Sequence, residues 1–271
     1  MKNVAGEFNR RISISKELIE ASGGILTLGV VTAKVQVSPL NQSLWDLLQD
    51  SGKSQKKYDP KTVSDITPIK ALRDTYKNLG VKVSSYQGSN EALLKRILSD
   101  KGLYQINTVV DINNYISITS LRSVGSYDLS KLSGDIEFRP GKTGETYIGT
   151  TKRAINLEHL PVLCDQDGPF GSPTSDSNKA LIHNSTTDLI TVIFSFDGEQ
   201  LLKEQMHEMT RLLTQYAGAT NVRTYSIKDL PQELLVEDIT DVVETVKTEK
   251  ELKERTEEDK MVVGTTNMIM Q

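Results

Sequence analysis

Apolar residues in the first half of the chain form one continuous run and several helical patterns. Residues 25–37 are mostly apolar and β-branched and follow a pair of glycines, which predicts a buried strand. Apolar positions recur every three or four residues after Asn41, after Thr67 and after Ser89, and each pattern predicts an amphipathic helix. The first two of these helices are separated by residues 51–57, whose serines and lysines predict a polar loop.

Residues 109–120 fit two periodicities. Their β-branched content is typical of a strand, whereas Val109, Asn113, Ile116 and Ser120 would share one face of a helix. We favour the helix.

The second half of the chain is dominated by short apolar runs between turn-forming residues. These runs predict strands at 136–139, 146–148, 160–164, 180–182, 189–195 and 221–226. The turn at 140–144 is expected to join the first two strands as a hairpin, and a long amphipathic helix is predicted after Gly198. Helices followed by strands and a further helix predict an α/β (α+β) fold, a three-layer domain with a mixed β-sheet.

The composition changes after Pro231. A short helical pattern follows, and residues 249–260 are almost wholly charged, which is typical of a solvated tail. We therefore expect one folded domain over residues 10–228 and a helical, charged C-terminal extension over residues 229–271.

Composition and charge narrow the classes of protein. The 271 residues carry a net charge of −4, which argues against tight non-specific binding to nucleic acid, so any RNA contact is expected to be local. No apolar stretch is long enough to span a membrane, and the N-terminal residues lack the apolar core of a signal peptide. The single cysteine, Cys164, cannot form a disulfide within this chain. We expect a cytoplasmic protein with no membrane partner; the sequence indicates no oligomeric state.

The sequence contains no motif for a metal or a cofactor. His159, His183 and His207 lie far apart, and Cys164 has no second cysteine near it, so metal-ligand spacing is missing. Residues 141–144 resemble part of a phosphate-binding loop but lack its glycine spacing, and they predict a β-turn. We expect neither a metal nor a cofactor.

Polar residues that suit a small ligand are concentrated in two segments. Residues 165–177 contain carboxylates, hydroxyls and prolines, so they are either a solvent loop or a ligand loop held between strands. In a ligand loop, carboxylates would hold an α-ammonium group and hydroxyls would position a water molecule. Asn113 and Asn114 either bind the carboxylate or ester of an amino acid or satisfy neighbouring backbone groups.

The stretch around Asn113 belongs to a longer pattern. Its residues are Val110-Asp111-Ile112-Asn113-Asn114-Tyr115, Tyr127-Asp128-Leu129-Ser130-Lys131-Leu132-Ser133-Gly134 and Gly144-Glu145-Thr146. Together they resemble the B3/B4 domain of the phenylalanyl-tRNA synthetase β subunit. Free-standing relatives of that domain resemble the chain over roughly residues 10–226.

The resemblance implies a function in translation quality control. In the synthetase, this domain hydrolyses the ester that wrongly joins tyrosine to the phenylalanine tRNA, because one binding step discriminates weakly between similar side chains. It implies here a free-standing module that binds the aminoacyl end of tRNA and hydrolyses mischarged aminoacyl-tRNA in trans, an ester hydrolase that does not itself charge tRNA. The synthetase's editing histidine corresponds to Gly125, and its loop glutamate has no counterpart in residues 168–171. The synthetase's editing residues therefore cannot be transferred to this chain.

This hypothesis places the amino acid between the predicted helix at 109–120, the turn at 127–128 and the loop at 165–177. The catalytic candidates, which would orient water, are Ser172, Thr174 and Ser175, and the substrate-binding candidates are Asn113, Asn114, Tyr127, Asp128, Asp165, Phe170 and Asp176. The candidates for RNA contact are Lys95, Arg96 and Lys101, and also Lys53, Lys56 and Lys57, although each group alone is also typical of a solvated face. The expected partners are tRNA or aminoacyl-tRNA and a small amino-acid ligand. Two alternatives stay open: a non-catalytic module that binds an amino acid or RNA, and a structural or partner protein.

Overall fold

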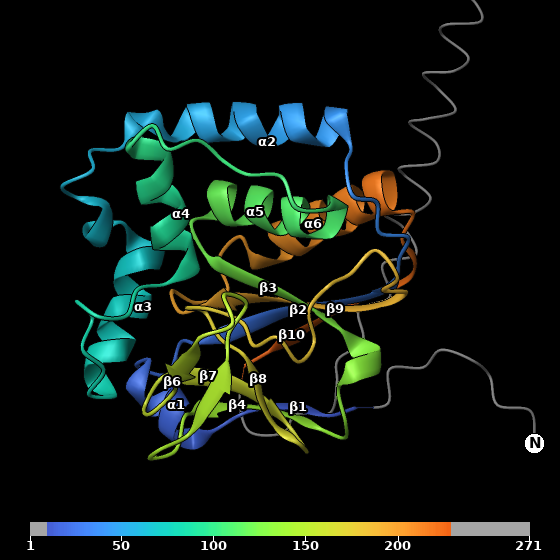
Figure 1. The fold of residues 1–271 in the computed structure, drawn as a ribbon. Helices are drawn as coiled ribbons and strands as arrows, with labels where there is room; N and C mark the ends of the chain where they lie inside the picture. The colour runs from blue at the N-terminus through green and yellow to red at the C-terminus, as the bar shows by residue number, and fades with distance from the viewer. Residues whose placement is uncertain (1–9, 229–271) are drawn as a thin grey trace, which may run out of the picture. The chain divides into compact units, whose positions relative to one another are not determined.

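A computed structural model describes residues 10–228, in which helices cover one face of a β-sheet and a second sheet lies against the other face (Figure 1). Within these residues the helices are α1 (Lys16–Ala21), α2 (Gln42–Ser54), α3 (Thr67–Asn78), α4 (Ser89–Leu98), α5 (Thr108–Ser120) and α6 (Leu202–Ala217), with the 3-10 turns η1 (Gln55–Lys57), η2 (Val63–Asp65) and η3 (Leu129–Lys131). The strands are β1 (Ile12–Ile14), β2 (Thr27–Lys34), β3 (Ser123–Asp128), β4 (Ile136–Pro140), β5 (Thr146–Ile148), β6 (Ala154–Asn156), β7 (Pro161–Asp165), β8 (Gly168–Gly171), β9 (Asp188–Ser195) and β10 (Thr220–Ile227). The predicted extension over residues 229–271 lies outside the described residues.

The strands form two four-stranded sheets and a small ribbon. The first sheet has the order β10-β2-β9-β3 and is antiparallel throughout. The second has the order β1-β4-β7-β8 and is mixed, because β1 pairs with β4 in parallel while the other pairs are antiparallel. Strands β5 and β6 pair only with each other among the named strands. The predicted α/β class with a mixed sheet is confirmed.

The first sheet is buried on both faces. Along β2, Leu28 and Val30 belong to the core between the two sheets, with Phe138 and Val162 from the second sheet. The neighbouring Val31 belongs to the core under the helices, since side chains alternate between the faces of a strand. This double burial explains why the sequence of β2 is an apolar run without polar alternation.

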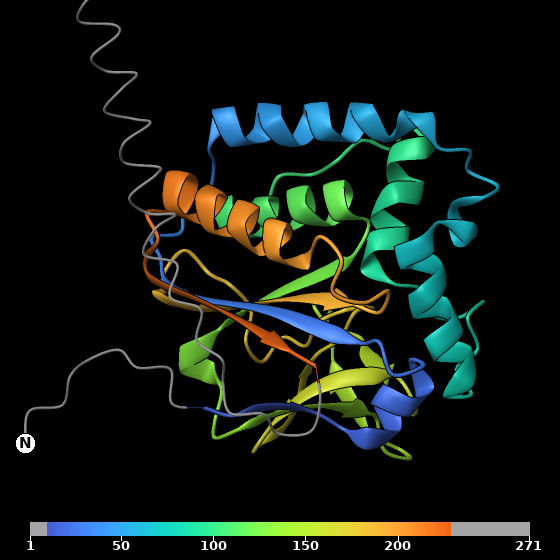
Figure 2. The ribbon, with the colours of Figure 1, turned by 180° about the vertical axis from the view of Figure 1, so that it is seen from behind.

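The helical layer consists of α5 and α6, with α2 on the outer side of α5 (Figures 1 and 2). Val109 and Ile112 of α5 pack with Met206 and Met209 of α6 in the core over the first sheet. Leu44 of α2 reaches the same core. The predicted helix at 109–120 is thus confirmed, and it is packed between the first sheet and α2.

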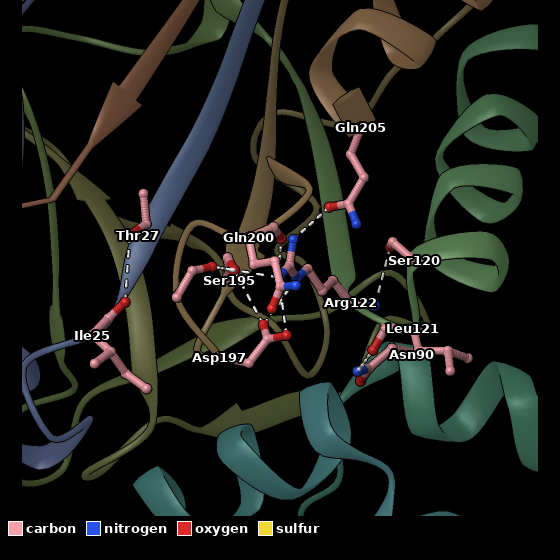
Figure 3. A network of polar contacts seen from close by, with 11 residues as sticks. Ile25, Thr27, Asn90, Ser120, Leu121, Arg122, Ser195, Asp197, Gln200 and Gln205 are labelled. Atoms are coloured by element: carbon pink, nitrogen blue, oxygen red, sulfur yellow. Dashed lines mark hydrogen bonds and ion pairs between the residues drawn. The ribbon is translucent and has the colours of Figure 1, made fainter. Parts of the chain in front are cut away.

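A buried arginine ties the start of β3 to the segment between β9 and α6 (Figure 3). Arg122 is 3% exposed, and its guanidinium donates to both carboxylate oxygens of Asp197, at 2.8 and 2.9 Å. It also donates to Gln205 Oε1 at 2.7 Å and to the carbonyl of Gln200 at 2.9 Å. Removing one partner of such a buried pair costs roughly 3–5 kcal/mol, so we interpret this network as structural.

Five local predictions are wrong. Residues 127–128, predicted as a turn, are the end of β3, and residues 168–171 of the predicted 165–177 loop form β8, which pairs with β7. Residues 51–57 continue α2 into η1 instead of forming a loop, because Gly52 is buried beside Leu103 and Ile97. Residues 180–182 form no strand; from a loop, Ala180 packs in the core between the sheets and Ile182 in the core under the helices. Strands β4 and β5 do not form a hairpin, since β4 pairs with β1 and β7.

Candidate functional site

A pocket of about 780 Å³ opens where α4, α5, β3 and the segment after β8 meet. Its polar lining comprises Gln87, Ser89, Lys95, Arg96, Ser99, Lys101, Asn113, Asn114, Ser117, Ser126, Thr150, Ser172, Thr174, Ser175, Asp176 and His183. The two polar segments singled out in the sequence, dozens of residues apart, therefore border one cavity. Its volume lies in the range typical of small-ligand sites.

The α5 side of the pocket presents two amides and a hydroxyl. Asn113 Oδ1 accepts a hydrogen bond from Ser126 Oγ at 2.8 Å, and Ser126 Oγ lies 2.6 Å from Thr191 Oγ1. Ser117, one helical turn after Asn113, has a buried Oγ for which the described residues provide no hydrogen-bond partner. A buried polar atom of this kind is normally satisfied, and a ligand group in the pocket would satisfy it.

Ser172 holds the loop and is not available to orient water. Its Oγ donates to the carbonyl of Ser175 at 2.7 Å and accepts from the backbone N–H groups of Thr174 and Ser175, at 3.2 and 3.0 Å. The hydroxyl of Tyr147, which donates to the carbonyl of Ser175, lies 3.3 Å from Ser172 Oγ. These contacts use the lone pairs and the proton of the hydroxyl, so Ser172 shapes the turn.

The other two hydroxyl candidates differ from each other. Thr174 Oγ1 lies 2.6 Å from the hydroxyl of Tyr76, a fully buried residue of α3, and burial raises the pKa of Tyr76. The hydroxyl of Ser175 has no partner within residues 10–228. Ser175 is therefore the candidate whose hydroxyl is available to a ligand or a water molecule.

Asp176 borders the pocket and rests on an aromatic pair. Its Oδ1 accepts from the hydroxyl of Tyr127 at 2.8 Å and from the backbone N–H of Ser172 at 3.4 Å. The ring of Tyr127 packs edge-on against Phe170, with centroids 4.9 Å apart, and both residues belong to the core between the sheets. Burial raises the pKa of Asp176 to about 6. Tyr127 and Phe170 thus lie behind the pocket wall and do not line it.

Asp128 and Asp165 lie outside the pocket lining. Asp128 caps η3 by accepting from the backbone N–H of Ser130 at 3.0 Å, and its other oxygen accepts from Thr186 Oγ1 at 2.9 Å. Asp165 forms an ion pair with Lys179 at 2.6 Å and borders a different hollow, beside β4 and β7. These two substrate-binding candidates therefore lie away from the pocket, because turn capping and ion pairing already use their oxygens.

The rim of the pocket on α4 is basic. Lys95 pairs at 2.6 Å with the buried Glu91, which also accepts from Arg73. Arg96 donates to the carbonyls of residues 101 and 102 and lies 4.9 Å from the ring centroid of Tyr104. Lys101 borders the same pocket and is exposed. The structure thus brings all three predicted RNA contacts to this pocket.

The other three lysine candidates for RNA contact lie away from this pocket. Lys53 pairs with Asp50 on its own helix, Lys56 pairs with Asp100, and Lys57 lies over the ring of Tyr58. Neither Lys53, Lys56 nor Lys57 lines the pocket.

Comparison with known proteins decides the family. Residues 71–218, more than half of the chain, match the B3/4 domain. The chain belongs to the B3/4 domain family. All residues that line the pocket, from Gln87 to His183, fall within the matched part of this B3/4 domain.

The B3/4 chain is similar to much longer curated proteins. The phenylalanine–tRNA ligase β subunit of Chromobacterium violaceum is 29% identical over 115 residues, which cover 40% of this chain and 14% of the relative. The corresponding subunit of Paramagnetospirillum magneticum is 34% identical over 83 residues, which cover 30% of this chain and 10% of the relative. The resemblance to this subunit is confirmed, and the chain spans a small part of its length.

Among solved structures, an N-terminal fragment of the phenylalanyl-tRNA synthetase β subunit from Pyrococcus horikoshii aligns with a TM-score of 0.44. The two chains are 11% identical, and the alignment covers 82% of this chain and 54% of the other.

Several polar residues of this B3/4 pocket were missed from the sequence, among them Ser117 and Ser126. Ser117 could have been found, because it lies four residues after Asn113 and so on the same helical face. Ser126 carried no such signal, since its role depends on the packing of β3 against α5.

In the described part of this B3/4 chain, no three or more histidine, cysteine or carboxylate side chains are grouped as metal ligands. Within residues 10–228, no helix combines the length and apolar character needed to cross a bilayer.

Proposed function

We propose that this protein binds the aminoacyl end of a tRNA in the pocket and hydrolyses mischarged aminoacyl-tRNA in trans. The observation that carries the proposal is the convergence of the α5 amides and the 172–176 segment on one pocket under a basic rim. Family membership supports it, because the curated relatives are tRNA ligase subunits. Because aminoacyl-tRNA is used in translation, a protein that hydrolyses it would act in the cytoplasm.

The pocket offers a partner to each part of such a substrate. Because Asn113 Oδ1 is held by Ser126, the NH₂ group of Asn113 is left to donate to the ester carbonyl. A donor in that place would stabilise the negative charge that develops on the carbonyl oxygen during hydrolysis. Ser175 supplies a hydroxyl that no other described residue engages, available for the attacking water, and Asp176 supplies a carboxylate.

The basic rim suits the phosphates that precede the tRNA terminus. Lys95, Arg96 and Lys101 lie on the same side of the pocket, at α4 and just after it. Binding through phosphates releases counterions, so the affinity for tRNA should fall as the salt concentration rises. These three residues give the pocket rim a local positive charge, so tRNA can bind there although the net charge of the chain is negative.

A non-catalytic binding module is the second candidate. It is favoured by Gly125, which leaves this pocket without a histidine at that position, and by the two hydroxyls already engaged by the fold. Such a module would bind an amino acid or an aminoacyl-tRNA and release both unchanged.

A panel of tRNAs, each charged with one labelled amino acid, separates the two candidates. We expect the protein to accelerate release of the label from at least one mischarged tRNA, with little effect on correctly charged ones. Release by the Asn113→Ala variant should be slower, while Lys16→Gln, an exposed change on α1, should behave as the wild type. If no tRNA is deacylated but binding is detected, the second candidate replaces the first.

A further inference from the structure

The phenol end of Tyr127 occupies a slot between two glycines. A Cβ atom at Gly125 on β3 or at Gly171 at the end of β8 would lie 2.2 Å from the Tyr127 hydroxyl oxygen. Neither glycine has a positive φ, so their role is to leave space. The slot fixes the position of a buried hydroxyl directly behind the pocket wall.

This hydroxyl holds one oxygen of the pocket carboxylate and leaves the other. The Tyr127 hydroxyl and the Ser172 backbone N–H both donate to Oδ1 of Asp176. Oδ2 has no hydrogen-bond partner within residues 10–228. Edge-on packing against Phe170 keeps the Tyr127 ring from turning away. The carboxylate is thus oriented, with one oxygen unused.

Asp176 is also the only acid among the described residues that line the pocket. The titratable groups near it are Tyr127 on β3 and Tyr147 on β5, and the pocket walls add Lys95, Arg96, Lys101 and His183. Burial raises the pKa of Asp176 to about 6, and the hydrogen bond from Tyr127 opposes that rise. A carboxylate with a pKa near neutrality is mostly ionised at pH 7 and accepts protons better than an ordinary aspartate.

We propose that Asp176 is the general base of the pocket and that Tyr127 is the residue that positions it. This inference rests on the proposed hydrolysis of aminoacyl-tRNA. Oδ2 takes a proton from water while the water oxygen bonds to the ester carbonyl carbon. The bond from that carbon to the ribose oxygen then breaks, and the proton passes from Asp176 to the ribose oxygen. The products are the free amino acid and the tRNA with its hydroxyl restored, and Asp176 is again ionised.

An ammonium ligand and a general base predict different kinetics for Asp176→Asn. Loss of a base lowers kcat by about 10²–10⁴-fold with KM nearly unchanged. Loss of an ammonium ligand raises KM and leaves most of kcat. The measurement is single- and multiple-turnover deacylation of the tRNA that the panel identifies as substrate.

The pH profile tests the positioning role of Tyr127. In Tyr127→Phe, loss of the hydrogen bond to the carboxylate should raise the pKa of Asp176, so the acid limb of the rate profile moves to higher pH. Tyr147→Phe is the matched control, because it removes a nearby buried phenol hydroxyl that bonds to Ser172 and to the Ser175 carbonyl and makes no hydrogen bond to Asp176. Its acid limb should move less than that of Tyr127→Phe. Carboxyl NMR titration of the unliganded proteins, with thermal melts to show that they are folded, should give the same shift without any substrate.

The outcomes separate this inference from the proposed function. A wild type that releases no amino acid from any tRNA overturns both. An active wild type with an equally active Asp176→Asn variant, or one changed only in KM, overturns the general base alone. An unchanged Asp176 titration in Tyr127→Phe overturns the positioning role.

Discussion

Ser126 Oγ lies 2.8 Å from Oδ1 of Asn113 and joins β3 to α5 at the pocket wall. This contact fixes which end of the amide is left for a ligand. Asn113→Ala should weaken binding of a non-hydrolysable aminoacyl-adenosine analogue by about 5–10-fold, since a hydrogen bond contributes roughly 1 kcal/mol. Isothermal titration measures the effect, and Asn184→Ala, an exposed amide outside the pocket, serves as the control. Equal affinities of the wild type and Asn113→Ala would remove Asn113 from the binding site.

Asp111 makes the stability of the protein depend on pH. Its Oδ1 accepts from the backbone N–H of Ile106 at 3.0 Å, and its Oδ2 is buried with no hydrogen-bond partner in the described part of the chain. Burial raises the pKa of Asp111 to about 6. A carboxyl whose pKa is higher in the folded state binds more protons when folded, so its contribution to stability is largest below the unfolded pKa and declines as the pH rises from about 4 to 6.

Asp111→Asn removes this titration and keeps the acceptor for Ile106. Relative to the wild type, the variant should gain up to about 3 kcal/mol in free energy of unfolding between pH 4 and pH 7.5. Urea unfolding at the two pH values gives the difference. If the free energies of unfolding of the variant and the wild type differ by the same amount at both pH values, the pKa of Asp111 is not raised by folding.

The glycine slot around Tyr127 should be intolerant of any side chain. Gly125→Ala and Gly171→Ala each place a Cβ against the Tyr127 hydroxyl and should cost about 1–3 kcal/mol, as overpacking does. Gly52→Ala is the control, because its Cβ would meet the flexible end of Leu103 at 3.3 Å and the site is helical. Thermal melts measure all three, and an unchanged melting temperature for Gly125→Ala would contradict the slot.

Lys101 should contribute to tRNA binding through its charge. Lys101→Gln should weaken tRNA binding and lower the slope of log affinity against log salt by about one, with no change in stability, since the side chain is exposed. The exposed Lys16 on α1 lies outside the pocket, and Lys16→Gln should leave the slope as it is. Equal slopes for the two variants would place tRNA on another surface.

The helical part of the site could be read from the sequence because its cause is local. Asn113 and Asn114 lie on α5, whose apolar residues recur with helical spacing and whose cap, Asn107, accepts from the N–H of Val110. The 172–176 turn is likewise local, since Ser172 bonds to residues two and three positions away.

The parts of the fold and the site that the sequence did not predict depend on pairing between residues far apart in the chain. The second sheet requires Ile12 to pair in parallel with Ile136, and no local pattern specifies that register. Tyr127 and Phe170 were predicted to touch substrate, but β3 and β8 direct them into the core between the sheets. The same packing created the contact between Tyr127 and Asp176, which only the folded chain shows.

The most direct measurement is a crystal structure of the protein with a non-hydrolysable 3′-aminoacylamino-adenosine. We predict that the aminoacyl group lies between the amide of Asn113 and the carboxylate of Asp176, with the adenosine toward Lys101. Electron density for the analogue in the hollow beside Asp165, or none in the pocket at saturating concentration, would contradict a pocket built for the aminoacyl end of tRNA.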